Sequence, residues 1–228
     1  MLAGSPGPHV FVPSRENLQL ADHDVDHFER SLRMRDGDPC TVTDGRGAWA
    51  NAVLRQGGRV EVQGSWRNVA EPRYQTTVAF SLVKGQKPEL VVQKLTEIGV
   101  DRIVGLMADR SVVRWDEAKV DKALLRWRRI ALEASMQSHR VRLPEIVGVV
   151  GSRSFFSSAD DVALANFGGA PVDDQRRCIA VGPEGGWTAE ELQLVSGRVS
   201  LGDGVLRAET AAIVAGTLMA AARRSTQL

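Results

Sequence analysis

The sequence predicts an α/β protein in which a small β-rich domain precedes a domain built on a mostly parallel sheet. Up to about residue 72, short apolar runs are separated by glycine turns, which is typical of consecutive antiparallel strands. After residue 73, short apolar runs alternate with helical patterns, and this order builds parallel sheets. Residues 162–165 and 178–181 are apolar at every position, as expected for strands buried on both faces. We therefore expect two domains, residues 1–72 and 73–228.

The first 72 residues predict a compact antiparallel barrel interrupted by one helix. The expected strands are 10–12, 40–43, 48–54 and 59–62, and the helix is expected at about 24–34. Barrels of this kind bind RNA or serve as structural adaptors, and the pattern alone leaves both roles open. Arg30, Arg33 and Arg35 are candidates for phosphate contact, or they are solvated arginines beside two aspartates.

The second domain shows clear start and stop signals for its helices. Pro88 can open a helix that Gly99 ends, and Thr188 with Glu191 forms a capping box for a helix through Val195. The strands expected here are 76–83, 102–107, 162–165, 178–181 and 198–201. The last helix is expected over 211–222, where small residues indicate close packing against a neighbour.

A helix that follows Asp116 carries one apolar and one basic stripe. Lys119, Lys122, Arg126 and Arg129 form the basic stripe, and thirteen Lys and Arg stand against eight Asp and Glu between residues 84 and 142. Such a stripe is either a solvated helix face or a surface for a polyanion. The candidate RNA contacts are Arg33, Arg35, Lys94, Lys119, Lys122, Arg126, Arg129, Gln137, Arg140 and Arg142.

Two glycine-rich loops near the C-terminus, residues 181–187 and 201–210, each follow an apolar run and lead into a helix. Glycines let a ligand lie against the main chain, so the pair predicts a slot at the carboxyl ends of the strands. Pro183 removes a backbone donor and Glu184 adds negative charge, which disfavours a phosphate and favours a neutral or cationic ligand. Either loop alone is also an ordinary strand-to-helix turn.

Composition excludes several classes of protein. The net charge is only +1, and the two cysteines and four histidines show no metal-ligand or disulfide spacing, so we expect no metal and a cytoplasmic location. The first residues lack the pattern of a signal peptide. The longest apolar run, 211–222, is too short to span a bilayer, so no membrane partner is expected.

Four motifs in order resemble the ribosomal RNA small subunit methyltransferase E family. They are Lys84-Gly85-Gln86-Lys87 with residues 92–100, Glu133-Ala134 to Gln137-Ser138 with Arg140 and Pro144-Glu145-Ile146, residues 181–186, and Leu206-Arg207 with Glu209-Thr210-Ala211. The resemblance implies a SPOUT-type methyltransferase domain with a C-terminal trefoil knot and S-adenosylmethionine as cofactor, preceded by a PUA-like RNA-binding barrel at 1–72. It also implies a homodimer that methylates N3 of one uridine in 16S ribosomal RNA of the small subunit.

The resemblance assigns the cofactor to backbone and apolar groups of the two loops and of the segment that follows the strand expected at 162–165. These residues are Asn166, Phe167, Val181, Gly182, Pro183, Glu184, Gly186, Leu201, Gly202, Val205 and Leu206. N3 of uracil must lose its proton, so Arg207 is the candidate for stabilising the developing charge, and Glu209 for accepting the proton or orienting Arg207. Thr210 would hold the helix start or contact the ligand. A structural ion pair between Arg207 and Glu209 is the alternative.

The sequence departs from the family pattern at His9, Met136, His139 and Asp203-Gly204. An arginine is usual in the family at the positions of His9 and Gly204, so these departures weaken the assignment of RNA contacts there. Two other functions stay open from the sequence. One is a SPOUT methyltransferase acting on transfer RNA or another ribosomal RNA site, and the other is a non-catalytic RNA-binding module of ribosome assembly.

Overall fold

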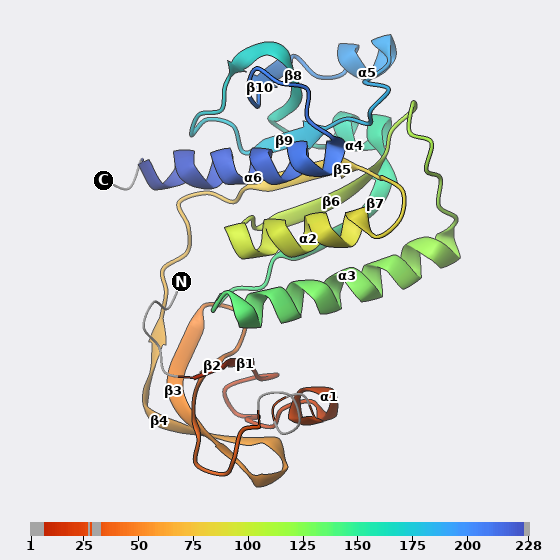
Figure 1. Cartoon of the computed structure of the whole chain (residues 1–228). Helices are drawn as coiled ribbons and strands as arrows, with labels where there is room; N and C mark the ends of the chain where they lie inside the picture. Colours follow the sequence, from red (N-terminus) through yellow and green to blue (C-terminus); the bar gives the residue numbers. More distant parts are fainter. Residues whose placement is uncertain (1–6, 27, 29–32, 226–228) are drawn as a thin grey trace. The chain divides into compact units, whose positions relative to one another are not determined.

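A computed structural model describes residues 7–26, 28 and 33–225, and the chain forms two compact units. The first unit comprises Met1–Pro72 and Leu132–Leu143, and the second comprises Arg73–Ala131 and Pro144–Leu228 (Figure 1). Sequence analysis places residues 132–143 in the second domain. The structure groups them with the first unit because the segment hydrogen-bonds to a turn there: Gly47 N donates to Val141 O at 2.8 Å, and Leu143 N to Gly45 O at 3.1 Å.

The first unit is built on a four-stranded sheet in the order β1-β2-β3-β4. Its strands are β1 (His9–Phe11), β2 (Pro39–Thr43), β3 (Ala48–Arg55) and β4 (Arg59–Asn68). β1 runs parallel to β2 and the other pairs are antiparallel. β4 extends six residues beyond the expected 59–62, through a largely exposed stretch that lacks an apolar pattern.

The helix of the first unit differs from the expected 24–34. α1 covers Asp22–Asp26, and it begins earlier than the pattern suggests. Residues 27 and 29–32, including the phosphate candidate Arg30, lie outside the described residues. Arg33 has a φ of 53°, which is incompatible with a helix, so the helical prediction is wrong at 33 and 34.

The second unit contains a six-stranded, wholly parallel sheet in the order β10-β8-β9-β5-β6-β7. The strands are β5 (Thr77–Ser81), β6 (Arg102–Met107), β7 (Glu145–Gly151), β8 (Val162–Pro171), β9 (Cys178–Val181) and β10 (Gly197–Ser200). The helices are α2 (Lys87–Ile98), α3 (Glu117–Gln137), α4 (Ser152–Ser158), α5 (Ala189–Gln193) and α6 (Ala208–Ser225), and residues 132–137 at the end of α3 belong to the first unit. The parallel sheet predicted from the alternating pattern is confirmed.

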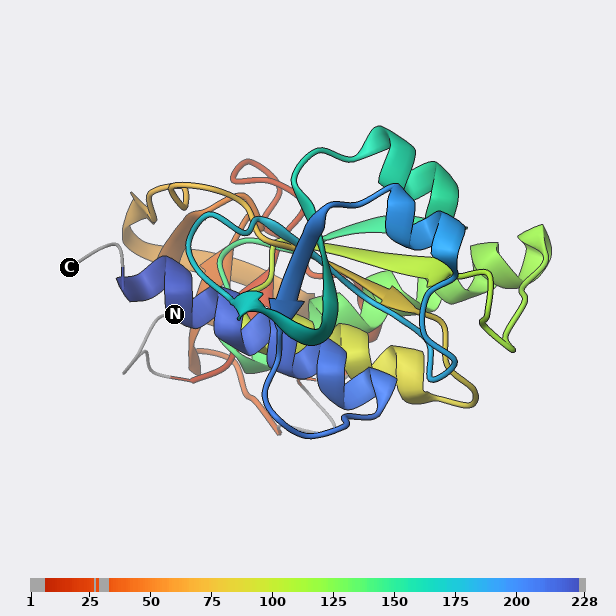
Figure 2. The same ribbon diagram turned by 90° about the horizontal axis from the view of Figure 1, so that it is seen from above.

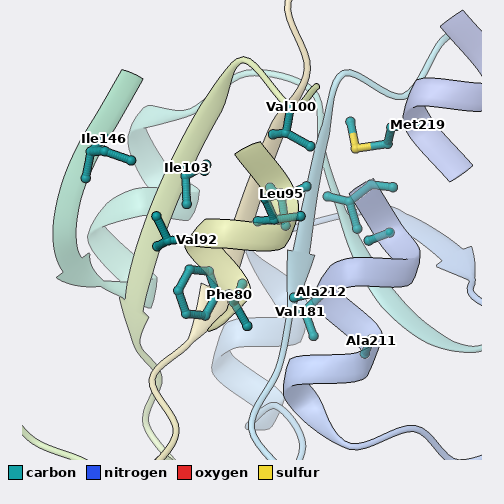
Figure 3. Packing of buried hydrophobic residues seen from close by; sticks show 14 of the residues in the cluster. Phe80, Val92, Leu95, Val100, Ile103, Ile146, Val181, Ala211, Ala212 and Met219 are labelled. Carbon is teal, nitrogen blue, oxygen red and sulfur yellow. The ribbon is translucent and has the colours of Figure 1, made fainter. Parts of the chain in front are cut away.

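Helices cover both faces of the parallel sheet, and alternate strand residues enter two separate cores (Figure 1 and Figure 2). Val78 and Phe80 face the core of α2, α6 and the buried Trp127, whereas Ala79 faces the core of α4 and Trp187. Figure 3 shows the first of these cores, with Val92 and Leu95 of α2 and Ala212 of α6 turned toward the strands. This two-sided burial explains the continuously apolar sequences of β9 and of residues 162–165 at the start of β8.

Close packing of α6 depends on a glycine. A Cβ atom at Gly216 would lie 2.6 Å from Cδ2 of Leu95, so a larger residue would push α6 away from α2. The same helix is tied to the start of the sheet by Arg223, which donates to the carbonyls of Tyr74 and Gly99 at 3.2 and 3.0 Å and pairs with Asp101. None of the described helices combines the length and hydropathy that a bilayer span requires.

Sequence analysis missed β7 and α4. β7 lies at the edge of the sheet and alternates between buried and exposed residues, so it lacks the continuous apolar run of the central strands. It also contains Gly148, and a glycine inside a strand weakens the sequence pattern of that strand. α4 is only seven residues long and has no side-chain cap, so it offers no start signal.

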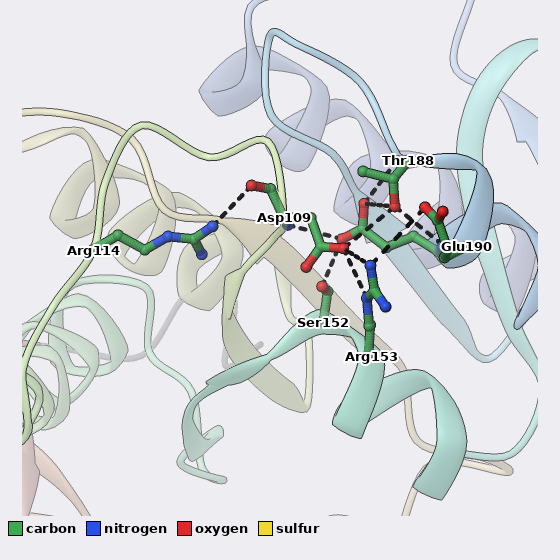
Figure 4. Close-up of polar contacts among 7 residues, drawn as sticks. Asp109, Arg114, Ser152, Arg153, Thr188 and Glu190 are labelled. Carbon is green, nitrogen blue, oxygen red and sulfur yellow. Dashed lines mark hydrogen bonds and ion pairs between the residues drawn. The ribbon is translucent and has the colours of Figure 1, made fainter.

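The fully buried carboxylate of Glu191 holds α5 against the sheet. Figure 4 shows the surrounding polar cluster, with Asp109, Ser152 and Thr188 turned toward one another. Glu191 accepts hydrogen bonds from Ser152 Oγ at 2.6 Å, Thr188 N at 2.8 Å and Asp109 N at 3.0 Å. Thr188 and Glu191 form the predicted capping box. Burial alone would raise the pKa of Glu191, but the hydrogen bonds from Ser152, Thr188 and Asp109 outweigh it and hold the pKa below the ordinary 4.5.

A buried histidine ties β1 to the segment after α3 within the first unit. His9 is 1% exposed, and its Nε2 lies 2.9 Å from the carbonyl of Arg140 while Nδ1 lies 2.8 Å from Thr41 Oγ1. A carbonyl only accepts, so the proton sits on Nε2 and Nδ1 accepts from the Thr41 hydroxyl. Burial lowers the pKa of His9 from 6.5 to about 4, with only partial compensation by the Arg140 carbonyl. His9 is therefore a structural residue of this unit.

Replacing Glu191 by Ala leaves three buried donors without an acceptor and removes the capping box. We expect the free energy of unfolding to fall by about 2–4 kcal/mol, measured by urea denaturation at pH 7. Glu190→Ala is the matched control on the same helix, because Glu190 is exposed and lies 3.9 Å from its partner Arg153. Equal stability of the two variants would contradict the role given to Glu191.

The buried His9 predicts loss of stability in mild acid. In the folded protein its pKa is about 4 and in the unfolded chain 6.5, so only the unfolded chain gains a proton between these values. The contribution of His9 is complete above pH 6.5 and falls by up to about 3 kcal/mol as the pH approaches 4. Urea denaturation of wild type and His9→Gln between pH 7 and 4 should give a shallower decline for the variant. Identical declines would refute the assignment.

Candidate functional site

A cavity of about 660 Å³ opens at the carboxyl ends of β9 and β10 in the second unit. The loop after β9, the loop after β10, the middle of β8 and the first turn of α6 line it. All eleven residues that the sequence assigns to a cofactor lie in its lining, and so does Arg207. Ala165, Trp187, Leu192, Gly204, Ala208 and Ala211 complete the lining.

The loop after β9 forms a tight turn beneath an aromatic side chain. Gly186 N donates to Pro183 O at 2.8 Å, and Gly186 has a φ of 69°, which few other residues adopt. Gly182 is needed for a different reason: a Cβ atom there would lie 2.9 Å from Cε2 of the Trp187 indole. Trp187 also packs edge-on against Phe156, with ring centroids 5.3 Å apart. The indole therefore fixes the shape of this loop.

The loop after β10 leaves apolar side chains at the rim of the cavity. Gly202 has a φ of 130°, so the chain turns sharply at the end of the strand. Val205 is 87% exposed and Phe167, from the middle of β8, is 61% exposed. Both are apolar side chains exposed beside the cavity, so they are candidates for contact with a ligand or partner.

The middle of β8 leaves the ladder to reach this cavity. β10 pairs first with Ala163 and Leu164 and then with Ala170 and Pro171, so residues 165–169 project from the sheet between the two contacts. Asn166 and Phe167 belong to this projecting segment. The sequence placed the end of the strand at residue 165, because the apolar run stops there.

The three predicted catalytic residues have different surroundings. Arg207 is exposed at the cavity, and its guanidinium makes no hydrogen bond or ion pair with any described residue. Thr210 is exposed on the first turn of α6 and does not line the cavity. Glu209 is buried and pairs with Lys87 of α2, with 2.8 Å between Oε1 and Nζ. Between these described residues, Arg207 and Glu209, the ion pair that was the alternative interpretation does not form.

The pairing with Lys87 decides the charge of Glu209. Burial acts to raise the pKa of its carboxyl, but the hydrogen bond from Lys87 and the nearby Arg207 lower it below 4.5. Glu209 is therefore ionised at neutral pH, and its Oε2 is buried without a partner among the described residues. Sequence analysis quoted Lys87 within a family motif but did not connect it with Glu209.

Several lining residues were missed, although some carried a signal. Trp187 directly follows the two glycines of its loop, and an aromatic side chain at that place could have been read as a cover for them. Ala208 and Ala211 lie three residues apart and share a face of α6, which helical spacing predicts. Gly204, where the family usually has arginine, lines the cavity.

Some of the predicted RNA contacts gather around a second cavity of about 470 Å³ in the second unit. Lys119, Lys122 and Arg126 of α3 line it together with Lys84, Arg114 and Trp115. Lys94 lies outside this lining and pairs with Glu97 at 2.8 Å. Arg129 is exposed on α3 but does not line the cavity either.

The remaining candidates for RNA contact belong to the first unit. Arg33, Arg35 and Gln137 are exposed, and Arg140 is half-buried. Arg142 is committed to structure, because it donates to the carbonyls of Arg46 and Val69, the latter at 2.9 Å. Within the described ranges, no group of histidine, cysteine and acidic residues has the geometry to hold a metal ion.

Comparisons with known proteins identify the family. The sequence model of the RNA methyltransferase domain matches residues 70–220. The ribosomal RNA small subunit methyltransferase E of Mycobacterium tuberculosis is 32% identical over 227 residues, covering 90% of this chain and 86% of the relative. That of Bacillus subtilis is 28% identical over 229 residues, covering 90% of both chains.

Solved structures agree with the sequence relatives. The crystal structure of a ribosomal RNA small subunit methyltransferase E from Neisseria gonorrhoeae, bound to S-adenosyl methionine, superposes with a TM-score of 0.80. It is 26% identical, and the match covers 93% of this chain and 96% of that one. The chain thus belongs to the ribosomal RNA small subunit methyltransferase E family, whose RNA methyltransferase domain it carries.

Proposed function

We propose that this protein transfers a methyl group from S-adenosylmethionine to N3 of one uridine in the 16S RNA of the small ribosomal subunit. The observation that carries the proposal is the cavity at the ends of β9 and β10, in a chain that matches the methyl-donor-bound N. gonorrhoeae structure over 93% of its length. The family resemblance supplies the uridine, its N3 atom and the 16S RNA.

The residues of the cavity fit the proposed cofactor. Glycines, apolar side chains and main-chain groups dominate the lining, and Arg207 is its only Lys or Arg among the described residues. A phosphate-bearing cofactor would find few donors here, whereas a flat adenosine and a sulfonium cation need apolar walls and carbonyl oxygens. The indole of Trp187 lies against Gly182 and contributes an apolar wall to the cavity.

S-adenosylmethionine supplies an electrophilic methyl group carried on a positively charged sulfur. The nucleophile is N3 of uracil, which must lose its proton before or during the attack, so negative charge develops on the neighbouring carbonyl oxygens. Arg207 is exposed at the cavity and has no protein partner among the described residues, so its guanidinium is free to stabilise that charge.

Glu209 and Thr210 take supporting roles in this proposal. Because its pKa is lowered, Glu209 is a weak base, and we propose that the Glu209–Lys87 pair acts through position and charge rather than by accepting the proton. The pair joins α2 to the first turn of α6 and fixes the segment that carries Arg207. Thr210 is exposed on the same turn but does not line the cavity, so its proposed role is at the start of the helix.

We also propose the trefoil knot, the PUA-like barrel and the homodimer that the family resemblance implies. The knot rests on the family resemblance. A Cβ atom at Gly169 would lie 2.5 Å from the carbonyl carbon of Val199, so the backbones of β8 and β10 approach each other closely in this region. Exposed Phe167 and Val205 beside the cavity support coverage by a second copy. RNA binding by the four-stranded unit and a cytoplasmic location complete the proposal.

Replacing Gly182 by Ala tests the cofactor loop. The added methyl group would push the Trp187 indole and distort the lining, so we expect the affinity for S-adenosylmethionine to fall about tenfold or more in a calorimetric titration. Gly151→Ala is the matched control: this glycine is exposed, has no positive φ and has open space around its Cβ position. Undiminished affinity in Gly182→Ala would argue against this loop as the cofactor site.

Replacing Arg207 by Ala tests the proposed charge stabilisation. We expect kcat for methyl transfer to fall about a hundredfold, with the dissociation constant for S-adenosylmethionine nearly unchanged, because the interaction forms mainly in the transition state. Arg224→Ala, exposed on the last turn of the same helix, is the control and should retain wild-type kcat. A wild-type rate in the Arg207 variant would remove Arg207 from the mechanism.

The substrate is tested by offering small-subunit particles, naked 16S RNA and transfer RNA side by side, all lacking the modification. We expect methyl transfer to small-subunit RNA only, and mass mapping of the product should locate the methyl group on N3 of a single uridine. Preferential methylation of transfer RNA, or of another atom, would overturn the substrate assignment. Failure to bind S-adenosylmethionine would instead indicate a non-catalytic RNA-binding module.

A further inference from the structure

The second cavity combines features that the proposed methyl transfer does not use. Four segments that are separate in the sequence line it: residues 83–85 after β5, Glu89 of α2, residues 112–115 before α3, and one face of α3. Its lining residues carry five cationic side chains and one carboxylate, and it shares no residue with the 660 Å³ cavity. The cations are Lys84, Arg114, Lys119, Lys122 and Arg126.

Most of this positive charge is available to a ligand. Lys84 and Lys122 are exposed and make no hydrogen bond or ion pair with a described residue. Arg126 makes only a 3.4 Å ion pair with Glu89, and Arg114 donates to the carbonyl of Asp109 at 2.8 Å. Cations that lie around one cavity and have few protein partners attract an anion such as a phosphodiester.

An aromatic side chain stands among these cations. Trp115 is half-buried against the core, with its ring centroid 6.0 Å from that of Trp127, so its position is fixed. Lys119 Nζ lies 5.2 Å from the Trp115 ring centroid, on a flexible side chain that can swing to a phosphate. Val112, which also lines the cavity, is 79% exposed.

These features together select a ligand with a flat face and a negative charge. A simple inorganic anion would use the cations but leave Trp115 and Val112 exposed to water. Glu89 supplies the one carboxylate of the lining, which is an acceptor for a ligand that also carries a hydrogen-bond donor. An unpaired nucleotide has a phosphate, a flat base and N–H donors, and a volume of about 470 Å³ admits one.

We propose that this cavity binds one unpaired nucleotide of the RNA substrate, separate from the uridine that is methylated. The base contacts Trp115, and the adjoining phosphates contact Lys84, Lys119 and Lys122. Bases in a duplex are stacked on each other and do not reach the indole, so the cavity recognises single-stranded RNA. The inference rests on the proposed function, because it takes RNA to be the substrate.

The test separates base contact from charge by using two fluorescent probes of equal length and charge. One is an oligouridylate of about 12 nucleotides, and the other is the same ribose-phosphate chain without bases. Fluorescence anisotropy should show that wild type prefers the oligouridylate about tenfold. Trp115→Leu should lose this preference, whereas Trp115→Phe, which keeps an aromatic face, should retain most of it.

The charge contacts are tested with the same probes at several salt concentrations. Lys84→Ala and Lys122→Ala should weaken the binding of both probes equally. Each variant should also reduce the slope of log K against log salt by about 0.7, the value for one phosphate of a single strand. Arg128→Ala is the matched control, because Arg128 is exposed on α3 but does not line the cavity. Its affinity and slope should equal those of wild type.

An undiminished base preference in Trp115→Leu, or equal binding by Lys122→Ala and Arg128→Ala, would overturn the inference. Thermal unfolding and calorimetric titration with S-adenosylmethionine show whether the Trp115 variants keep the fold and the first cavity. Methyl transfer by wild type is measured separately. If wild type fails to methylate small-subunit RNA, the proposed function is wrong, and the anisotropy result still decides whether the cavity binds a nucleotide.

Discussion

The parallel pairing of β10, β8 and β9 brings the carboxyl ends of β9 and β10 to one edge of the sheet, and the candidate site depends on this constraint. β8 lies between the two strands and pairs with both, so the loops that follow β9 and β10 emerge close together. β9 is buried at all four residues and is hydrogen-bonded on both sides, to β5 and to β8, so its end is held at a fixed place in the sheet. The sheet therefore fixes where main-chain groups of the loops line a cavity.

The two cavities of the second unit have opposite chemistry. The cavity at the ends of β9 and β10 is lined mainly by glycines and apolar side chains, which suits a neutral or cationic small molecule. The cavity beside α3 is lined by five cations and an indole, which suits a nucleotide and its phosphates. In the proposed function the first cavity holds the methyl donor and the second helps to hold the RNA.

Sequence patterns predicted features that depend on neighbouring residues. The apolar strands β8 and β9, the capping box of Thr188 and Glu191, and the glycine loops follow from local spacing, and the structure has all of them. Contacts between distant segments gave no such signal. The pairing of Glu209 with Lys87, the commitment of Arg142 to backbone carbonyls and the meeting of Lys84 with Trp115 depend on tertiary structure. The edge strand β7 was missed because its burial is one-sided and interrupted by glycine.

A crystal structure of the protein with S-adenosylmethionine tests the central claim most directly. The account predicts an ordered adenosyl group in the 660 Å³ cavity, held by main-chain groups of Gly182, Leu201 and Gly202, with the methyl group open toward Arg207. Clear density for the cofactor elsewhere on the molecule, with this cavity closed by Trp187 or Phe167, would contradict it.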